Sequence, residues 1–184
     1  MRYILVLVLV SALAGGMAGI AKAEKRWSFV VIPGVALGPV QLEMNFARAL
    51  TAMPERPTKV ERVETYDPAT GVVLTTARVT WDRVKPEGEG TMNVYIKADF
   101  ADGHMKSTWG NDDRLSYRGK NIADLRMADF IVALGPPDKV RDIFGGYAMI
   151  WDSRGIIVAF EDRDDGEKVA GIGIFRPGRF AKDW

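Results

Sequence analysis

Alternating apolar and polar positions form the strongest pattern in this chain. From Thr91 to Phe100 the even-numbered residues are apolar, whereas Asn93, Lys97 and Asp99 in the odd-numbered set are polar. A period of two places the apolar set on one face of a strand and predicts that this face is buried. Similar stretches separated by turn residues predict strands over 59–66, 72–81, 91–100, 147–151, 155–161 and 169–175. Their short connections favour an antiparallel meander.

Two stretches change from strand to helical spacing. Apolar residues from Phe46 to Met53 recur at the spacing that places side chains on one face of a helix, and they follow Asn45. A second apolar stretch starts with Phe130 after Asp129 and stops at Gly135, which precedes two prolines. Asn and Asp side chains cap helix starts, and Gly suits the position after a helix end. We therefore predict two short helices with Asn45 and Asp129 as N-caps, and with the two phenylalanines in equivalent buried sites.

The strands of the C-terminal half are apolar on both faces, at 147–151 and at 156–160. Only one face can lie under a helix of the same half. The other face, taken as the one richer in aromatic side chains, must pack against the N-terminal half or receive a partner, because an exposed patch of that size is unusual in soluble monomers. Packing within the chain is the favoured alternative, since aromatic cores are commoner than binding sites.

An internal match links the two halves of the chain. Residues 42–50 resemble 125–134, and 71–73 resemble 155–157, at a spacing of 80 to 85 residues. The string VALGP also occurs twice, at 35–39 and 132–136, but its surroundings differ and it lies outside this register. The pattern predicts an α+β fold of two tandem units, 24–110 and 111–184, each with a helix packed on about three antiparallel strands.

Several motifs of the C-terminal half carry a family resemblance. They are Leu125-x-Met127, Leu134-Gly135-x-Pro137, Trp151-Asp152-x-x-Gly155 and Val169-x-x-Ile172-x-Ile174-Phe175-x-Pro177. This set resembles the repeat of small exported bacterial proteins related in fold to the β-lactamase inhibitory protein and to the BamE-type (SmpA-type) outer-membrane assembly lipoprotein. The resemblance implies a fold and a protein-binding role. The chain departs from that repeat where Glu43 and Arg126 replace the usual Gly before Met.

The first 23 residues have the features of a secretory signal peptide. Arg2 precedes an apolar run, and Ala21-Lys22-Ala23 forms a small-x-small cleavage site. We therefore expect cleavage after Ala23 and a periplasmic or secreted product. The chain contains no cysteine, so neither a disulfide nor a lipid-modified N-terminal cysteine is available, and we expect no membrane anchor after cleavage.

The charge of the chain is nearly balanced. Of the 25 basic residues, Arg2 and Lys22 leave with the leader, so 23 remain against 24 acidic residues. A balance of this kind gives no electrostatic reason to expect nucleic acid or an anionic membrane as a partner.

Candidate catalytic and metal-binding groups are few. His104 is the single histidine and lies beside a turn glycine, so a zinc site would need mainly carboxylates. The acidic run 161–167 does not fit a calcium loop, because Arg163 and Ile172 stand at ligand positions, and it is predicted as a hairpin turn. Glycines 171 and 173 lie within a predicted strand, where they mark a bulge or the close approach of another segment. We predict no catalytic residue, no metal and no cofactor.

These observations lead to the interpretation of an exported non-catalytic protein-binding module, of the inhibitor, immunity-type or envelope-assembly kind. Its predicted partner is another protein. Arginine and aromatic residues are favoured at energetic centres of interfaces. The predicted contact residues combine one loop and the tail of the C-terminal half: Asp152, Arg154, Arg176, Arg179 and Phe180. The alternative for this tail is a terminal extension that covers the sheet.

A second class of function stays open at this point. The chain could be an exported small-ligand carrier or hydrolase, with carboxylates such as Asp152 and Glu161 in a cleft between the two units. Paired carboxylates perform acid-base chemistry when their environments separate their pKa values.

Overall fold

The computed structural model describes residues 29–87, 90–161 and 168–180. In chain order the elements are β1 (Phe29–Ile32), β2 (Ala36–Leu37), β3 (Val40–Gln41), α2 (Phe46–Ala52), β4 (Lys59–Asp67), β5 (Val72–Glu87), β6 (Gly90–Ala101), β7 (His104–Gly110), β8 (Leu115–Tyr117), β9 (Lys120–Asn121), η1 (Ile122–Asp124), α3 (Met127–Leu134), β10 (Lys139–Ile143), β11 (Gly146–Trp151), η2 (Asp152–Arg154), β12 (Ile156–Glu161) and β13 (Lys168–Phe175). The predicted signal peptide lies outside the described residues.

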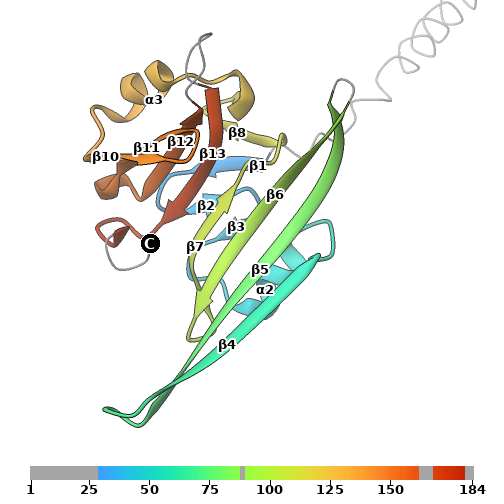
Figure 1. The fold of residues 1–184 in the computed structure, drawn as a ribbon, viewed down its shortest axis with the longest axis vertical. Helices are drawn as coiled ribbons and strands as arrows, with labels where there is room; N and C mark the ends of the chain where they lie inside the picture. The colour runs from blue at the N-terminus through green and yellow to red at the C-terminus, as the bar shows by residue number, and fades with distance from the viewer. Residues whose placement is uncertain (1–28, 88–89, 162–167, 181–184) are drawn as a thin grey trace, which may run out of the picture.

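The strands form two sheets. The larger has eight strands in the order β10-β11-β12-β13-β7-β6-β5-β4, with every neighbouring pair antiparallel. The smaller has five strands in the order β3-β2-β1-β8-β9, in which β1 and β8 run parallel. Figure 1 shows the long β4–β5–β6 strands on one side and the short C-terminal strands on the other.

The prediction of an α+β fold with two helix-plus-sheet units is wrong, because the fold is mainly β. The two described α-helices have only seven and eight residues, whereas strands account for most of the described chain. The C-terminal strands do not form a sheet of their own: β13 pairs with β7, from Ile172 opposite Gly110 to Phe175 opposite Ser107. Both sheets contain strands from either side of the boundary predicted after residue 110.

The individual strand predictions agree with the structure. All six predicted strands are present, and β4–β5 and β11–β12–β13 are antiparallel neighbours in sequence order. On β6, Val94, Ile96, Ala98 and Phe100 are buried, as the alternation predicted. The sequence patterns missed β1–β3 and β7–β10, most of which are too short to show a period of two.

The main hydrophobic core lies between one face of the large sheet and a layer formed by the small sheet and the helices. Large-sheet residues such as Trp81, Ile96 and Phe160 are in one buried cluster with Leu37 and Phe130 from the opposing layer. Because this single cluster includes residues from both halves of the chain, the two halves are packed on a shared core.

The helix caps follow the prediction in one case and differ in the other. Asn45 caps α2, where its side chain accepts a hydrogen bond from the backbone amide of Arg48 at 2.8 Å. For α3 the predicted cap is wrong, because Arg126 occupies the N-cap position and Asp129 lies three residues later. The Asp129 carboxylate accepts a hydrogen bond from the Arg126 amide at 3.0 Å. Gly135 is the C-cap, with a positive φ of 84°.

Phe46 begins α2, whereas Phe130 is the fourth residue of α3, and the two rings are not equally buried. Phe130 is completely buried and stacks on Tyr117, with ring centroids 5.3 Å apart. Phe46 is only partly buried and contacts Phe100 edge-on, also at 5.3 Å. The prediction of equivalent buried sites is therefore wrong for Phe46.

The aromatic face of the C-terminal strands is buried within the chain, as favoured, but the prediction that this is the face turned away from the helix of its own half is wrong. It lies against α3, where Trp151 and Phe160 both contact the Phe130 ring. The opposite face carries smaller side chains, including Ala148 and Ile157, and belongs to a second hydrophobic cluster.

Candidate functional site

The candidate site is the face of the large sheet turned away from the helices, here called the open face. It contains two adjoining hollows of about 520 and 640 Å³. The side chains and strand positions that line them are Glu61, Val63, Thr76, Arg78, Tyr95, Lys97, Asp99, Ser107, Trp109, Arg141, Ile143, Ala148, Ile157, Ala159 and Phe180, among others. The two hollows share Arg78, Asp99 and Ser107, so together they cross the sheet from β4 to β10.

Trp109 on β7 lies at the centre of the open face. A Cβ atom on Gly171 would come within 2.4 Å of the Trp109 ring, so the indole covers this glycine on the neighbouring strand β13. The indole Nε1 donates a hydrogen bond to the Tyr95 hydroxyl at 3.1 Å. The Lys97 ammonium lies 4.4 Å from the centre of the Tyr95 ring. These contacts hold the two aromatic rings in place without burying them fully.

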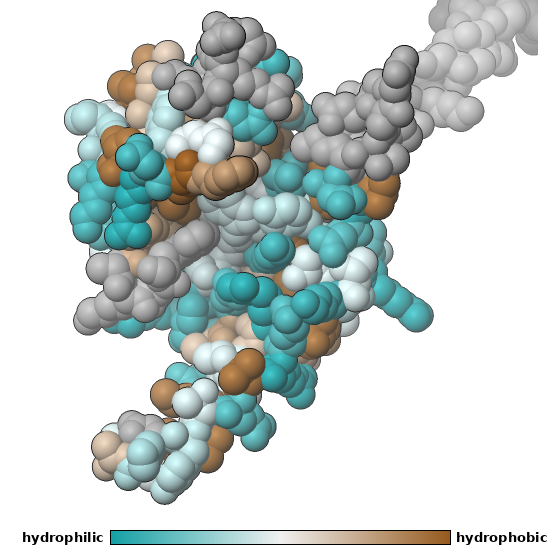
Figure 2. All heavy atoms as spheres, in the orientation of Figure 1, coloured by the Kyte–Doolittle hydropathy of each residue, from teal (hydrophilic) through white to brown (hydrophobic). Residues whose placement is uncertain are grey.

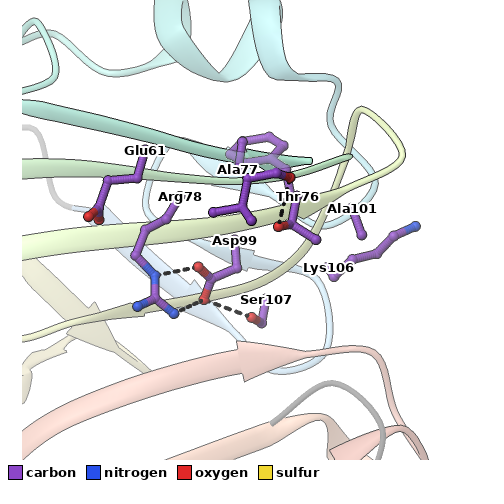
Figure 3. A pocket seen from close by; sticks show the side chains of 10 residues that line it. Glu61, Thr76, Ala77, Arg78, Asp99, Ala101, Lys106 and Ser107 are labelled. Atoms are coloured by element: carbon purple, nitrogen blue, oxygen red, sulfur yellow. Dashed lines mark hydrogen bonds and ion pairs between the residues drawn. The ribbon is translucent and has the colours of Figure 1, made fainter. Parts of the chain in front are cut away.

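The smaller hollow contains a bidentate ion pair. Arg78 donates to Asp99 through Nε at 2.6 Å and through Nη2 at 3.2 Å, and the Ser107 hydroxyl lies 3.5 Å from the same carboxylate (Figure 3). The hydrogen bond with Asp99, helped by its charge, raises the pKa of the Arg78 guanidinium. Arg78 remains exposed, so the pair presents a fixed charged group to solvent.

The larger hollow has an apolar floor and an aromatic wall. Its lining includes the apolar side chains of Ala148, Ile157 and Ala159, together with the Phe180 ring. The exposed Arg141 guanidinium lies 4.9 Å from the centre of the Phe180 ring. An apolar surface bordered by arginine and aromatic side chains suits a protein or ligand surface that is partly apolar.

Two of the contact residues predicted from the sequence have structural roles. Phe180 is buried, with its ring centroid 5.2 Å from that of Phe175. Its backbone amide donates to the Asp152 carboxylate at 3.1 Å, and the Gly178 amide donates to the Asp152 carbonyl at 2.9 Å. Asp152 therefore ties the tail to the sheet, and the tail covers part of the apolar face, which agrees with the alternative of a covering extension.

The predicted arginines lie elsewhere. Arg154 is exposed in η2, and Arg176 is exposed and forms an ion pair with Glu43. Arg179 is half-buried beside Phe180 in the chain. Of the five predicted contact residues, only Phe180 lines one of the two hollows.

The sequence patterns did not identify the residues at the centre of the open face. Tyr95, Lys97 and Asp99 occupy the polar side of the predicted strand 91–100, so a signal for them was present. Nothing in the sequence pattern connects Trp109 with Gly171, because these residues are 62 positions apart and meet only through the β7–β13 pairing.

The other candidate groups found in the sequence are not brought together. Asp152 lies in η2, before the start of β12, whereas Glu161 is the last residue of β12, a strand about 17 Å long, so the two carboxylates are at opposite ends of this strand. His104 is exposed at a tight turn, with its Nδ1 3.0 Å from the Asp102 carbonyl. Among the described residues no group of three or more His, Asp or Glu side chains has the arrangement of a metal site. The predicted turn within 162–167 lies outside the described residues.

No protein-family model, no curated protein and no solved structure matches this chain. The resemblance to the β-lactamase inhibitory protein and the BamE-type lipoprotein therefore stays a prediction. Within the described part of the chain, no helix is long and apolar enough to cross a membrane.

Proposed function

We propose that this chain is an exported, non-catalytic protein-binding module that holds its partner on the open face of the eight-stranded sheet. The observation that carries the proposal is the fixed aromatic centre of this face. Trp109 is anchored by Gly171 and by Tyr95, yet both rings remain partly exposed. Trp, Tyr and Arg are the residues enriched at energetic centres of protein interfaces, and rigid side chains lose little entropy on binding.

The surroundings of the aromatic centre support the same function. Arg78 and Arg141 are exposed on either side of Trp109, and the apolar floor lies between them. An apolar centre with charged groups around it is the usual arrangement of a specific interface. The partner would be a protein of the same compartment, bound in the manner of an inhibitor, an immunity protein or an envelope-assembly factor.

A small-ligand carrier is the second candidate. The volume of the larger hollow, about 640 Å³, is within the range of small-molecule sites. The hydrolase alternative loses its proposed pair of groups, because Asp152 and Glu161 lie at opposite ends of β12.

The test compares partner capture by the wild-type protein with capture by Trp109→Ala and by Arg141→Glu. We expect each change to weaken binding of the captured protein about tenfold or more, as interface hot-spot substitutions do. Arg48→Glu is the matched control for charge, because Arg48 is exposed on α2, on the other side of the large sheet.

Thermal midpoints of all variants separate lost binding from lost folding. Unchanged affinity in Trp109→Ala and Arg141→Glu would contradict a binding role for the open face. Recovery of a small molecule from the purified protein, without any protein partner, would favour the carrier.

A further inference from the structure

Strand β4 is an exposed edge of the large sheet. It stands at the end of the strand order, and among the described strands it pairs only with β5. Val60, Val63 and Tyr66 on this strand are 45%, 57% and 63% exposed. A long edge strand with exposed apolar side chains is a template for pairing with another strand, and proteins usually block it.

The outer part of the β4–β5 hairpin also lacks support from the rest of the fold. Strand β6 pairs with β5 only from Thr76 onward, so the hairpin beyond Val63 and Thr76 consists of two strands. Figure 1 shows it projecting from the body of the protein, and Figure 2 shows apolar side chains among the polar ones along it. Val72, Val73 and Leu74 are each about half exposed there. A two-stranded hairpin without a third strand is only marginally stable in water.

We propose that β4 pairs antiparallel with β4 of a second copy of this chain, with the two-fold axis at Val63. In this register Val63 faces Val63, and Arg62 of each copy faces Glu64 of the other. Val60 faces Tyr66 in the same way. Opposite charges and apolar or aromatic pairs placed directly across two strands stabilise an antiparallel sheet.

The two registers next to the proposed one are unfavourable. Moving the centre by one residue in either direction places Arg62 opposite Arg62 or Glu64 opposite Glu64. Within the described part of the chain, neither of these two side chains has an oppositely charged partner. Arg62 only stacks on the Phe46 ring, 4.6 Å from its centre. The charges of β4 are thus complementary to those of a second β4.

The other edge of the sheet does not show this complementarity. Strand β10 paired with itself around Arg141 would place Arg141 opposite Arg141 and Val140 opposite Asp142. In this register β10 therefore lacks the charge complementarity that β4 has with a second β4.

The resulting dimer supports the part of each subunit that projects. The outer end of one β4 lies beside the inner end of the other, which is backed by its own β5 and β6. Each hairpin then gains neighbouring strands along its whole length. In this register, odd-numbered residues of one β4 face odd-numbered residues of the other, and even-numbered residues face even-numbered ones. The open faces of both copies therefore lie on the same side of one continuous sheet.

Charge reversal provides the test, with protein expressed from the full sequence and its mass measured by analytical ultracentrifugation over a range of concentrations. We expect the wild-type protein to dimerise, and Arg62→Glu and Glu64→Arg each to weaken dimerisation about tenfold or more, because each change turns two attractive cross-strand pairs into repulsive ones. Mixing the two single variants should produce a heterodimer, since each then faces an opposite charge. The double variant R62E/E64R should dimerise like the wild type.

Lys139→Glu on β10 is the matched control and should leave the dimer intact. Rescue by mixing shows that the single variants are folded. A wild-type protein that stays monomeric at high micromolar concentration would overturn the proposal. Single variants that dimerise as well as the wild type, or a mixture that does not associate, would also overturn it.

Discussion

At the scale of single residues, identical side chains take different roles in different surroundings. The string VALGP includes β2 in its first copy, whereas in its second copy it ends α3 at Gly135. At Gly171 the neighbouring strands determine why a glycine is needed. As predicted, it marks both an irregularity and a close approach: the β12–β13 register shifts beside it, and Trp109 lies over it.

Gly171→Ala is expected to disturb the open face. The added Cβ would lie 2.4 Å from the Trp109 ring, so the ring must move and its hydrogen bond with Tyr95 is strained. We expect a loss of about 1–3 kcal/mol in the free energy of unfolding. The denaturant midpoint measures this loss, and tryptophan fluorescence reports the displaced ring.

The same substitution in a Trp109→Ala background is the control. Without the indole there is room for the new methyl group, so Gly171→Ala should then cost much less. Equal costs in both backgrounds would show that the glycine is needed for a reason other than contact with Trp109.

At the scale of elements, the two helices lie in segments of similar sequence, 42–50 and 125–134, but their packing differs. Phe130 on α3 contacts Tyr117, Trp151 and Phe160. Phe46 on α2 has Phe100 on one side and the Arg62 guanidinium on the other, and it remains partly exposed. The first helix therefore covers the long strands less completely than the second covers the short ones.

Replacing the two phenylalanines should reveal this difference. We expect Phe130→Ala to cost about 3–5 kcal/mol in the free energy of unfolding, because it leaves a cavity in a closed core. Phe46→Ala should cost roughly 1–2 kcal/mol, because less apolar area is removed from the core. Denaturant midpoints of the two variants test the order, and equal losses would contradict the difference in packing.

Most of the longer strands were predictable at this scale, whereas the short strands were not. The strand of 91–100 was evident because one face is buried and the other is solvated, which produces a local period of two. Strand β7 was not evident, because Ser107 and Thr108 are buried although they are polar. The Thr108 hydroxyl donates to the Lys97 carbonyl at 2.8 Å, a contact that depends on the neighbouring strand.

At the scale of the whole molecule, a buried charge network connects distant segments. Asp112, between β7 and β8, is almost fully buried. It accepts hydrogen bonds from Arg114 at 2.7 and 2.8 Å and faces Arg83 of β5 at 3.4 Å. Arg114 also pairs with Glu55, which follows α2. The network therefore attaches the segment that links β7 of the large sheet to β8 of the small sheet to the long strand β5.

This network should make stability depend on pH. Burial alone would raise the pKa of Asp112, but the hydrogen bonds and charge of Arg114, with a contribution from Arg83, outweigh it and lower the pKa. A carboxylate with a lowered pKa in the folded state stabilises the fold above its ordinary pKa of about 3.9, and this contribution is lost as the pH falls through the folded value.

Asp112→Asn is expected to cost about 3 kcal/mol at neutral pH, because it leaves two arginines without this carboxylate. The difference from the wild type should become smaller below about pH 4, where the carboxylate of the unfolded chain begins to be protonated before the folded one, whose pKa is lowered. Urea midpoints of both proteins across pH 3 to 7 test this, and a difference that does not change with pH would contradict it.

The sequence alone determined the positions of most long strands, the start of α2 at Asn45 and the end of α3 at Gly135, because alternation and capping depend on residues that are close in the chain. Only the tertiary structure decided that β7 pairs with β13, that the fold is mainly β, and that Trp109 lies on Gly171. These features join segments about 60 residues apart, and no local pattern specifies which strand edges meet. For the same reason the open face could not be predicted: its residues are ordinary polar and apolar strand positions until the sheet places them side by side.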